Sequence, residues 1–540
     1  MLSSTFSSLG HTTSSITEAI RLTKLLPVIQ DKNSKLYWSL LLSLLGTSYM
    51  IKSFWRMMVV PKHLAHIPKV SSLPWFWSIL KGESHDVRMK KLMLPTINEH
   101  GLCLKYILGR WTVTVGDPIL LQILLKDVYT FPKEQVSMDP DLILTNQEPN
   151  MGNANGQDWK RQRSVANPVF HRAMPIQVFG QITKRMFESM DKQANNDVVD
   201  MADYMRRYAL DCLGLGIFNF DMEAVTDSAS PYATLYKEAF SIVRDPFVYL
   251  FPAYTRIPSK YIPYRNRARK ANENLRKILS DIIVDRKRTI RENNLVLSDD
   301  LDTSNPQAPD LLTLMIMAAE DGHVPNTSYL TDGELVSNLA VFFVAGHETT
   351  ASATASFLYY LAANPEIQDR ARQEVLSVMG DSPEDVIPTR EELKQMEYLD
   401  NCIHETMRIN PPTSGNLPRV VTKDTNLGGF FVPKETRVSI ELYSVHHIAK
   451  YWDQPQVFNP DRSSFRKDAI WMPFGYGPRT CIGQNFSLSE QRVVQAMMLK
   501  RYTWTLAPNS EHAHGLKNAN GGGIGLLGPE SLKVKLTRRY

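Results

Sequence analysis

The stretch FGYGPRTCIGQNFS, Phe474 to Ser487, decides the fold class because it surrounds one cysteine with groups that can hold a buried thiolate. A thiolate is a good ligand for iron, but inside a protein it needs N–H donors and a nearby cation to stay ionised. Gly477 and Gly483 allow the backbone to turn tightly around Cys481, and Arg479 lies two residues before it. The apolar run from Leu488 to Leu499 predicts a helix whose N-terminus would further favour the anionic sulfur. We therefore expect Cys481 to act as an iron ligand.

A second stretch, Ala345-Gly-His-Glu-Thr-Thr350, lies upstream in the middle of a long apolar helix. The capping box from Thr331 to Glu334 predicts the start of this helix, which could run for about nine turns. Gly346 costs about 1 kcal/mol relative to alanine in a helix interior, so we expect it to give a diatomic ligand room. Glu348 and Thr349 are placed to relay protons there. Taken alone, the motif also fits a kinked core helix with a solvated Glu-Thr pair.

Further patterns are weak as single observations. Glu405 and Arg408 form an i, i+3 pair that is worth only about 0.3 kcal/mol on a surface. The stretch from Trp159 to Arg163 is typical of a basic amphipathic helix. Two further helices are predicted at 365–379 and 397–409.

In combination these stretches resemble the cytochrome P450 family, and in particular its eukaryotic microsomal members, those of fungi among them. Phe474 to Gly483 matches every specified position of the haem-binding loop FxxGxRxCxG. Ala345 to Thr350 is similar to the oxygen-activation motif AGx(D/E)T(T/S), and the ExxR, PxR and WxxxR patterns occur in the family's order. The tail GPESLKVKLTRR resembles the family's C-terminal strands, so the resemblance covers about Pro61 to Tyr540.

The resemblance implies an α+β fold, predominantly α-helical, with a smaller β region. It also implies a haem b whose iron is ligated by Cys481. The residues that would contact the haem or its propionates are Trp159, Arg163, Arg419, Phe474, Arg479, Cys481 and Gly483. Glu405, Arg408 and Arg462 would form a structural network that fixes the thiolate loop, while Glu348 and Thr349 would be catalytic.

The activity implied is a monooxygenase that inserts one oxygen atom from O₂ into an apolar substrate, with electrons from NADPH delivered by NADPH-cytochrome P450 reductase and in some cases cytochrome b5. Lys160 and Arg161 could dock an acidic reductase. A haem-thiolate isomerase or dehydratase, which needs neither O₂ nor a reductase, is the alternative, and Thr349 argues against it. A third interpretation is a membrane haem protein without catalysis, which would not need the acid-alcohol pair.

Substrate contacts are expected from 135–150, 339–343, 413–417 and 524–527. The candidate residues are Leu339, Phe343, Thr413, Asn416 and Ile524, with Asn416 a partner for a substrate hydroxyl. The segments are mostly apolar, which fits a lipid, steroid, terpenoid or aromatic compound.

The N-terminal part predicts an anchor. No charged residue occurs from Leu36 to Ile51, and prolines at 61, 68 and 74 suit a stiff hinge. We therefore expect a segment at 1–35, a transmembrane anchor at 36–60 and a catalytic domain at 61–540. A buried core helix is the alternative for a run this short. The expected location is the endoplasmic reticulum membrane, single-pass, with a cytosolic catalytic domain; a mitochondrial membrane is the alternative.

Composition excludes several other classes. The net charge of +5 is the small difference between 61 basic and 56 acidic residues, which does not favour a nucleic-acid binder. Four cysteines in 540 residues, without zinc-ligand spacing, do not form a disulfide framework and point to a reducing compartment.

Overall fold

The computed structural model describes residues 34–107, 109–135, 148–170, 174–193, 198–241, 245, 254, 256–293, 311–320, 330–462, 470–519 and 525–540. The chain divides into two compact units, residues 1–60 and residues 61–540. Ile524 and most of the predicted 135–150 substrate segment lie outside the described residues.

The described part of the first unit is helix α2 (Ser34–Met58). It extends beyond the charge-free run and includes Lys52 and Arg56. Within the ranges given above, no helix is both long and apolar enough to cross a bilayer. The predicted transmembrane anchor is therefore not supported, because serine, threonine and these two cations dilute the apolar residues of α2.

The larger sheet of the second unit has the strand order β1-β2-β7-β4. Residues 102–115 form the antiparallel hairpin β1–β2, and β2 pairs in parallel with β7. The strands of this sheet are β1 (Leu102–Ile107), β2 (Arg110–Val115), β4 (Arg419–Val420) and β7 (Arg437–Ile440). The pairing joins the start of the body to the segment that carries Arg419.

Two smaller sheets complete the β region. The C-terminal tail forms a strand, as predicted, and this strand pairs on both sides in the order β3-β9-β8. The strands β5 and β6 pair with each other. Their strands are β3 (Val198–Asp200), β5 (Thr425–Leu427), β6 (Phe430–Val432), β8 (Tyr502–Leu506) and β9 (Lys533–Arg538).

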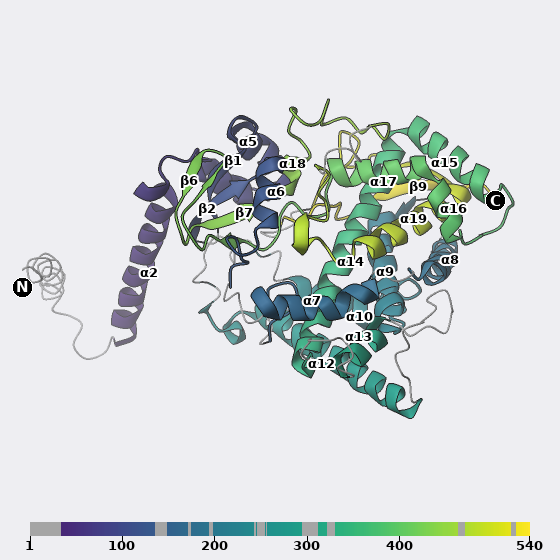
Figure 1. Cartoon of the computed structure of the whole chain (residues 1–540), viewed down its shortest axis with the longest axis horizontal. Coiled ribbons are helices and arrows are strands. Elements are labelled where there is room, and N and C mark those ends of the chain that lie inside the picture. The colour runs from purple at the N-terminus through teal and green to yellow at the C-terminus, as the bar shows by residue number, and fades with distance from the viewer. Residues whose placement is uncertain are drawn as a thin grey trace, which may run out of the picture. The chain divides into compact units, whose positions relative to one another are not determined.

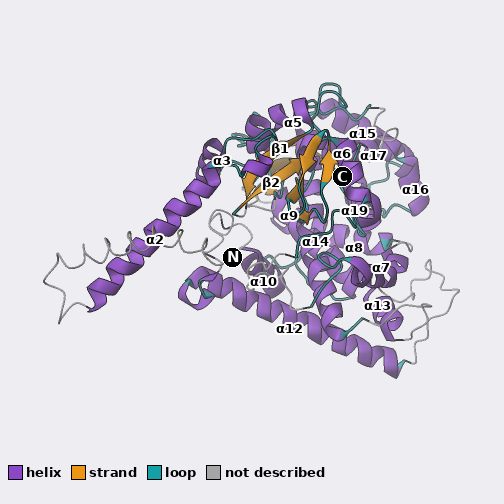
Figure 2. Cartoon of the chain, turned by 60° about the vertical axis from the view of Figure 1, so that its left-hand side comes forward, coloured by secondary structure: helices purple, strands orange, loops and turns teal. Residues whose placement is uncertain are grey.

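Helices make up most of the body (Figure 2). The predicted helices at 365–379 and 397–409 are present as α15 (Pro365–Met379) and α17 (Glu397–Ile409). The other helices of four or more residues are α3 (Ser72–Leu80), α4 (His85–Arg88), η2 (Met89–Met93), α5 (Leu94–His100), α6 (Pro118–Lys126), α7 (Gly156–Phe170), α8 (Ile176–Gln193), α9 (Met201–Leu213), η3 (Gly214–Phe218), α10 (Pro231–Phe240), α12 (Pro263–Glu292), α13 (Leu311–Glu320), α14 (Asp332–Ala363), α16 (Arg390–Gln395), α18 (Leu442–Val445) and α19 (Gln484–Arg501).

Helix α14 runs through the middle of the body and packs against α9, α12, α17 and α19 (Figure 1). Its predicted capping box is present, since the Glu334 N–H donates to Thr331 Oγ1 at 3.1 Å and the Thr331 N–H donates to Glu334 Oε2 at 3.0 Å. Its 32 residues give a length of about 48 Å. This length allows one helix to contact both α12 and α19, the helix that follows Cys481.

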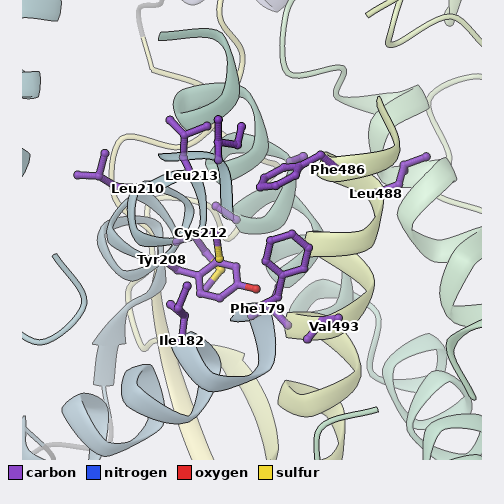
Figure 3. Close-up of a cluster of buried hydrophobic side chains, with 14 of the residues drawn as sticks. Phe179, Ile182, Tyr208, Leu210, Cys212, Leu213, Phe486, Leu488 and Val493 are labelled. Carbon is purple, nitrogen blue, oxygen red and sulfur yellow. The ribbon is translucent and has the colours of Figure 1, made fainter. Parts of the chain in front are cut away.

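Part of the apolar core packs against α19, from its first turn onward. Figure 3 shows Phe179, Tyr208, Cys212 and Phe486 converging from α8, α9 and α19. The rings of Phe179 and Phe486 meet edge to face with centroids 5.0 Å apart. Because Phe486 lies five residues after Cys481, this packing fixes the end of the thiolate loop.

Candidate functional site

The loop that carries Cys481 is held by its own backbone. The Cys481 N–H donates to the Phe474 carbonyl at 2.9 Å, and the Gly475 N–H donates to the Met472 carbonyl at 2.9 Å. Gly477 has φ +72° and approaches the Leu125 carbonyl so closely that a Cβ would lie 3.1 Å from it. This position therefore needs glycine, as the sequence predicts.

Gly483 has a different role from the predicted one. Its φ of −83° is open to any residue, so it is not required for a tight turn. Its N–H instead donates to the Cys481 sulfur. The Cys481 side chain is solvent-accessible but lies deep enough that desolvation raises the pKa of its thiol, while the Gly483 N–H and the cations Arg163 and Lys133 lower that pKa. These three groups favour the thiolate.

Four cations gather beside Cys481. Burial, together with the neighbouring Arg479, Arg419 and Arg163, lowers the pKa of Lys133 to about 7. Burial also lowers the pKa of Arg479 to about 9 and that of Arg419 to about 10. Such a group of mutually repelling cations needs an anion to be stable.

The hydrogen bonds of these cations go to neutral oxygens. Arg479 donates to the Ala154 carbonyl at 2.6 Å, and its guanidinium carbon lies 3.9 Å from the centroid of the Trp159 ring. Arg419 donates to the Phe131 carbonyl at 2.7 Å, and Arg163 Nε donates to Asn167 Oδ1 at 2.7 Å.

Several buried donors of these cations, and of Trp159 beside Arg479, have no partner. They are Trp159 Nε1, Arg479 Nε, and Arg419 Nε and Nη2. Unsatisfied buried N–H groups on cations are costly, and two propionates would satisfy both the charge and the donors. The residues present therefore fit a haem with its iron toward Cys481. Lys133 belongs to this cluster, but sequence reasoning missed it because it stands in no motif.

Helix α14 presents one open face among buried neighbours. Ala345 is exposed and Val341 and Thr349 are partly exposed, at a spacing of four residues, whereas Phe342, Phe343 and Val344 are buried. The Thr349 hydroxyl donates to the Ala345 carbonyl at 2.6 Å. This face is where α14 can contact a ligand.

Gly346 does not provide open space. A Cβ at this position would lie 2.8 Å from Leu213 Cδ1 in α9. Glycine therefore allows α14 to pack closely on α9. The prediction that Gly346 gives a diatomic ligand room is corrected, because the exposed position of this turn is the neighbouring Ala345.

Glu348 turns toward α9. Its side chain is buried, and its Oε2 lies 4.0 Å from Arg206 Nε. Arg206 also donates to the Pro529 and Glu530 carbonyls at 2.9 and 2.8 Å. His347 Nε2 bonds the Arg206 carbonyl at 2.8 Å. The acid of the motif is thus held by a partner that also binds the C-terminal tail.

The structure brings Glu405, Arg408 and Arg462 together. Glu405 accepts from Arg408 Nε at 2.7 Å and from Arg462 Nε at 3.0 Å, with the first two side chains fully buried. Arg408 also donates to the His446 carbonyl at 2.7 Å, and His446 Nε2 accepts from the Met472 N–H at 2.9 Å. The network reaches the thiolate loop through His446 and Met472.

The described residues that were predicted to contact substrate differ in their burial. Leu339 and Phe343 lie in the core at 0% and 1% exposure, away from the open face of α14. Thr413 is half-buried and pairs with Leu526 in an isolated bridge. Asn416 is exposed, and its Oδ1 accepts from the Leu417 N–H at 2.7 Å.

The two residues predicted to dock a reductase, Lys160 and Arg161, differ in their surroundings. Arg161 donates two hydrogen bonds to Glu334 at the start of α14, one of them at 2.9 Å. It is therefore used inside the body, whereas Lys160 is exposed.

Comparison with known proteins agrees with this geometry. A family model described as cytochrome P450 matches residues 67–535. The chain is similar to cytochrome P450 3A5 of Homo sapiens, with 27% identity over 73% of this chain and 76% of that protein. It is similar to cytokinin hydroxylase of Arabidopsis thaliana, with 30% identity over 67% of each chain. The crystal structure of the cytochrome P450DA heme domain has the same fold, with a TM-score of 0.72 and 20% identity over 88% of this chain and 98% of that one.

Proposed function

Because the chain belongs to the cytochrome P450 family, we propose that it binds haem b through the Cys481 thiolate and inserts one oxygen atom of O₂ into an apolar substrate. The observation that carries the proposal is the combination of Cys481 with a cluster of four cations, two of which, Arg419 and Arg479, have buried N–H groups without partners. Such a cluster suits the two propionates of a haem.

The bound haem would supply the oxygen chemistry, with the thiolate favouring O–O cleavage. The chain's own residues would supply position and protons. Gly483 N–H, Arg163 and Lys133 would favour the anionic sulfur against the burial that raises the pKa of its thiol. Thr349, on the open face of α14, would hold a proton at its Oγ1, and Glu348 would resupply that proton from its site beside Arg206. The presence of this alcohol favours the monooxygenase over the isomerase or dehydratase.

The electrons would come from NADPH through a reductase, with cytochrome b5 as a second donor. The exposed Lys160 of α7 supports this, since α7 also carries Trp159 and Arg163 beside the haem site. A positive surface close to the cofactor suits an acidic electron donor.

We further propose that α2 attaches the protein to a membrane. Its exposed large apolar side chains include Leu44, Met50, Ile51 and Trp55 at 59% or more, and Trp favours the membrane interface. The proposed compartment is the endoplasmic reticulum, with the body in the cytosol.

The test of the reaction is isotopic. The purified full-length haem protein is screened with a fatty acid, a steroid and a monoterpene for Soret shifts. The best ligand is then incubated with NADPH, reductase and ¹⁸O₂. One ¹⁸O atom in the product supports the proposal, whereas turnover at the same rate under argon contradicts it and indicates the isomerase or dehydratase.

A further inference from the structure

A cavity of about 350 Å³ lies between η3, α10 and α12. Three aromatic rings line it, those of Phe218, Phe220 and Tyr232, and the second half of α12 adds Ile278 and Ile282 from one helical face. Sites that take a small organic molecule typically have volumes from about 300 to 1,000 Å³ and apolar or aromatic walls. The cavity therefore has the size and the lining of a ligand site.

The aromatic end of the cavity is fixed by the chain that follows η3. Asn219 has φ +47°, a left-handed conformation that asparagine adopts more readily than most residues. The Phe220 N–H donates to the Gly214 carbonyl at 2.9 Å, and the rings of Phe220 and Tyr232 meet edge to face with centroids 5.2 Å apart. These rings are in place before a ligand arrives, which reduces the ordering cost of binding.

The exposed edge of the cavity carries negative charge. Asp281 and Asp285 lie one turn apart on α12, and both are exposed. Asp285 is paired with Arg288 at 3.3 Å, whereas Asp281 makes no ion pair with any residue in the described part of the chain. Arg286 also lines the cavity, but its Nη2 donates to the Phe218 carbonyl at 3.3 Å. Two like charges one turn apart disfavour a helix, so a bound cation at Asp281 would stabilise α12.

Two packed rings separate this cavity from the open face of α14. The ring of Phe218 stacks on that of Phe343 with centroids 6.4 Å apart. Phe343 is buried in the core, away from that open face. A molecule in the cavity would therefore bind apart from the haem site and from a substrate on α14.

We infer that the cavity binds organic cations that join an aromatic ring to an ammonium group. The rings of Phe220 and Tyr232 would pack against the aromatic part and attract the cation, and Asp281 would neutralise the ammonium charge. The inference goes beyond the proposed reaction, because it assigns a second ligand site that uses no residue of the haem site.

The test uses a probe that cannot bind the haem iron. The (1-naphthylmethyl)trimethylammonium ion joins an aromatic ring to an ammonium group, and its nitrogen has no lone pair. The compounds 1-naphthylmethanol and 1-naphthaleneacetate carry the same ring with no charge and with a negative charge. Binding to the full-length haem protein is measured by isothermal titration calorimetry, with and without an azole inhibitor on the iron.

Three variants separate the parts of the site. Asp281→Asn removes the carboxylate that has no ion pair, and Tyr232→Leu removes one ring. The control Glu397→Gln removes an exposed carboxylate elsewhere and gives the same net charge as Asp281→Asn. Because Asp281 is exposed, its replacement should not affect folding. The Soret spectrum of each variant should match the wild type, which separates this test from the haem assignment.

The wild type should bind the cation most tightly, the neutral alcohol more weakly and the carboxylate least, with the same affinities in the presence of the azole. Asp281→Asn should weaken binding of the cation by about fivefold, which is the upper range for an exposed ion pair, and should leave binding of the alcohol unchanged. Tyr232→Leu should weaken binding of both by about threefold. The control should bind all three probes like the wild type.

Failure of the wild type to bind the cation would overturn the inference, as would equal affinity for the cation in the wild type and Asp281→Asn. Cation binding that the azole abolishes would also overturn it, because the probe would then occupy the haem site.

Discussion

The hydroxyl groups of Thr350 and Ser487 lie 3.0 Å apart and join α14 to α19. Gln491 Nε2 extends the link by donating to Ser487 Oγ at 3.2 Å. The adjacent Thr349 instead faces the open side of α14 and bonds Ala345. Two consecutive threonines of one motif thus have different positions. Thr349 lies on the predicted ligand face of α14, whereas Thr350 lies between α14 and α19.

Replacement of Cys481 by serine should abolish the thiolate spectrum of the haem protein. An alcohol does not ionise at neutral pH in this environment, so the reduced carbonyl complex should lose its thiolate-type absorption. The matched control is Cys402→Ser, which changes a cysteine that is buried in α17. A mutant at 481 that absorbs like the wild type would refute the ligand assignment.

Thr349→Ala should retain haem and substrate binding but divert reducing equivalents to peroxide. The reason is the loss of the proton held at Oγ1. The measurement is the ratio of product and of hydrogen peroxide to NADPH consumed. Thr350→Ala serves as the control, since that hydroxyl faces Ser487. It should lower the free energy of unfolding by about 1 kcal/mol and leave the coupling of product to NADPH unchanged. Tight coupling in Thr349→Ala would contradict the relay role.

The helices and the loop that holds the thiolate were predictable because periodicity, capping and turn residues act locally. The capping box at Thr331 and the ends of α15 and α17 follow from such signals. Long-range geometry was not predictable in the same way. The contact of Gly346 with Leu213, the place of Phe343 in the core and the use of Arg161 by Glu334 depend on which face of a helix meets its neighbour.

Lys133→Met should weaken haem retention. Lys133 is one of four cations at the predicted propionate site, and methionine keeps its volume without its charge. Haem transfer to an excess of apomyoglobin should become several-fold faster, which corresponds to about 1 to 2 kcal/mol for a lost charge-assisted hydrogen bond. The control is the exposed Lys160→Met. Unchanged transfer in the Lys133 variant would remove this residue from the haem site.

Glu490→Gln should change how stability depends on pH. Glu490 is 1% exposed in the core, and burial raises the pKa of its carboxyl well above the ordinary value, although Cys212 opposes this. A carboxyl whose pKa is higher in the folded state stabilises the fold fully below its unfolded pKa, and this contribution is lost as pH rises toward the folded pKa.

The wild type should therefore lose stability relative to Glu490→Gln as pH rises from about 5 to 8, by up to about 1.4 kcal/mol per pH unit. Denaturant unfolding at several pH values measures the difference, with the exposed Glu397→Gln as control. A difference between wild type and Glu490→Gln that does not vary with pH would contradict the neutral buried carboxyl.

The last prediction concerns the compartment of the body and uses the sequence Asn485-Phe-Ser487, which is an N-glycosylation acceptor. A steric clash with the core does not protect it, because Asn485 is exposed at the start of α19. The Ser487 hydroxyl, which the acceptor sequence requires, is bonded to Thr350 in the folded protein, so a glycan could be attached only before α19 packs on α14. We predict that Asn485 carries no glycan because the body faces the cytosol.

Endoglycosidase treatment of the membrane-bound protein should leave its electrophoretic mobility unchanged, and added protease should digest the body in intact microsomes. A variant with an acceptor sequence placed at its N-terminus should gain a glycan if that end is lumenal. Protection of the body from protease, or a glycan on Asn485, would show that the body faces the lumen.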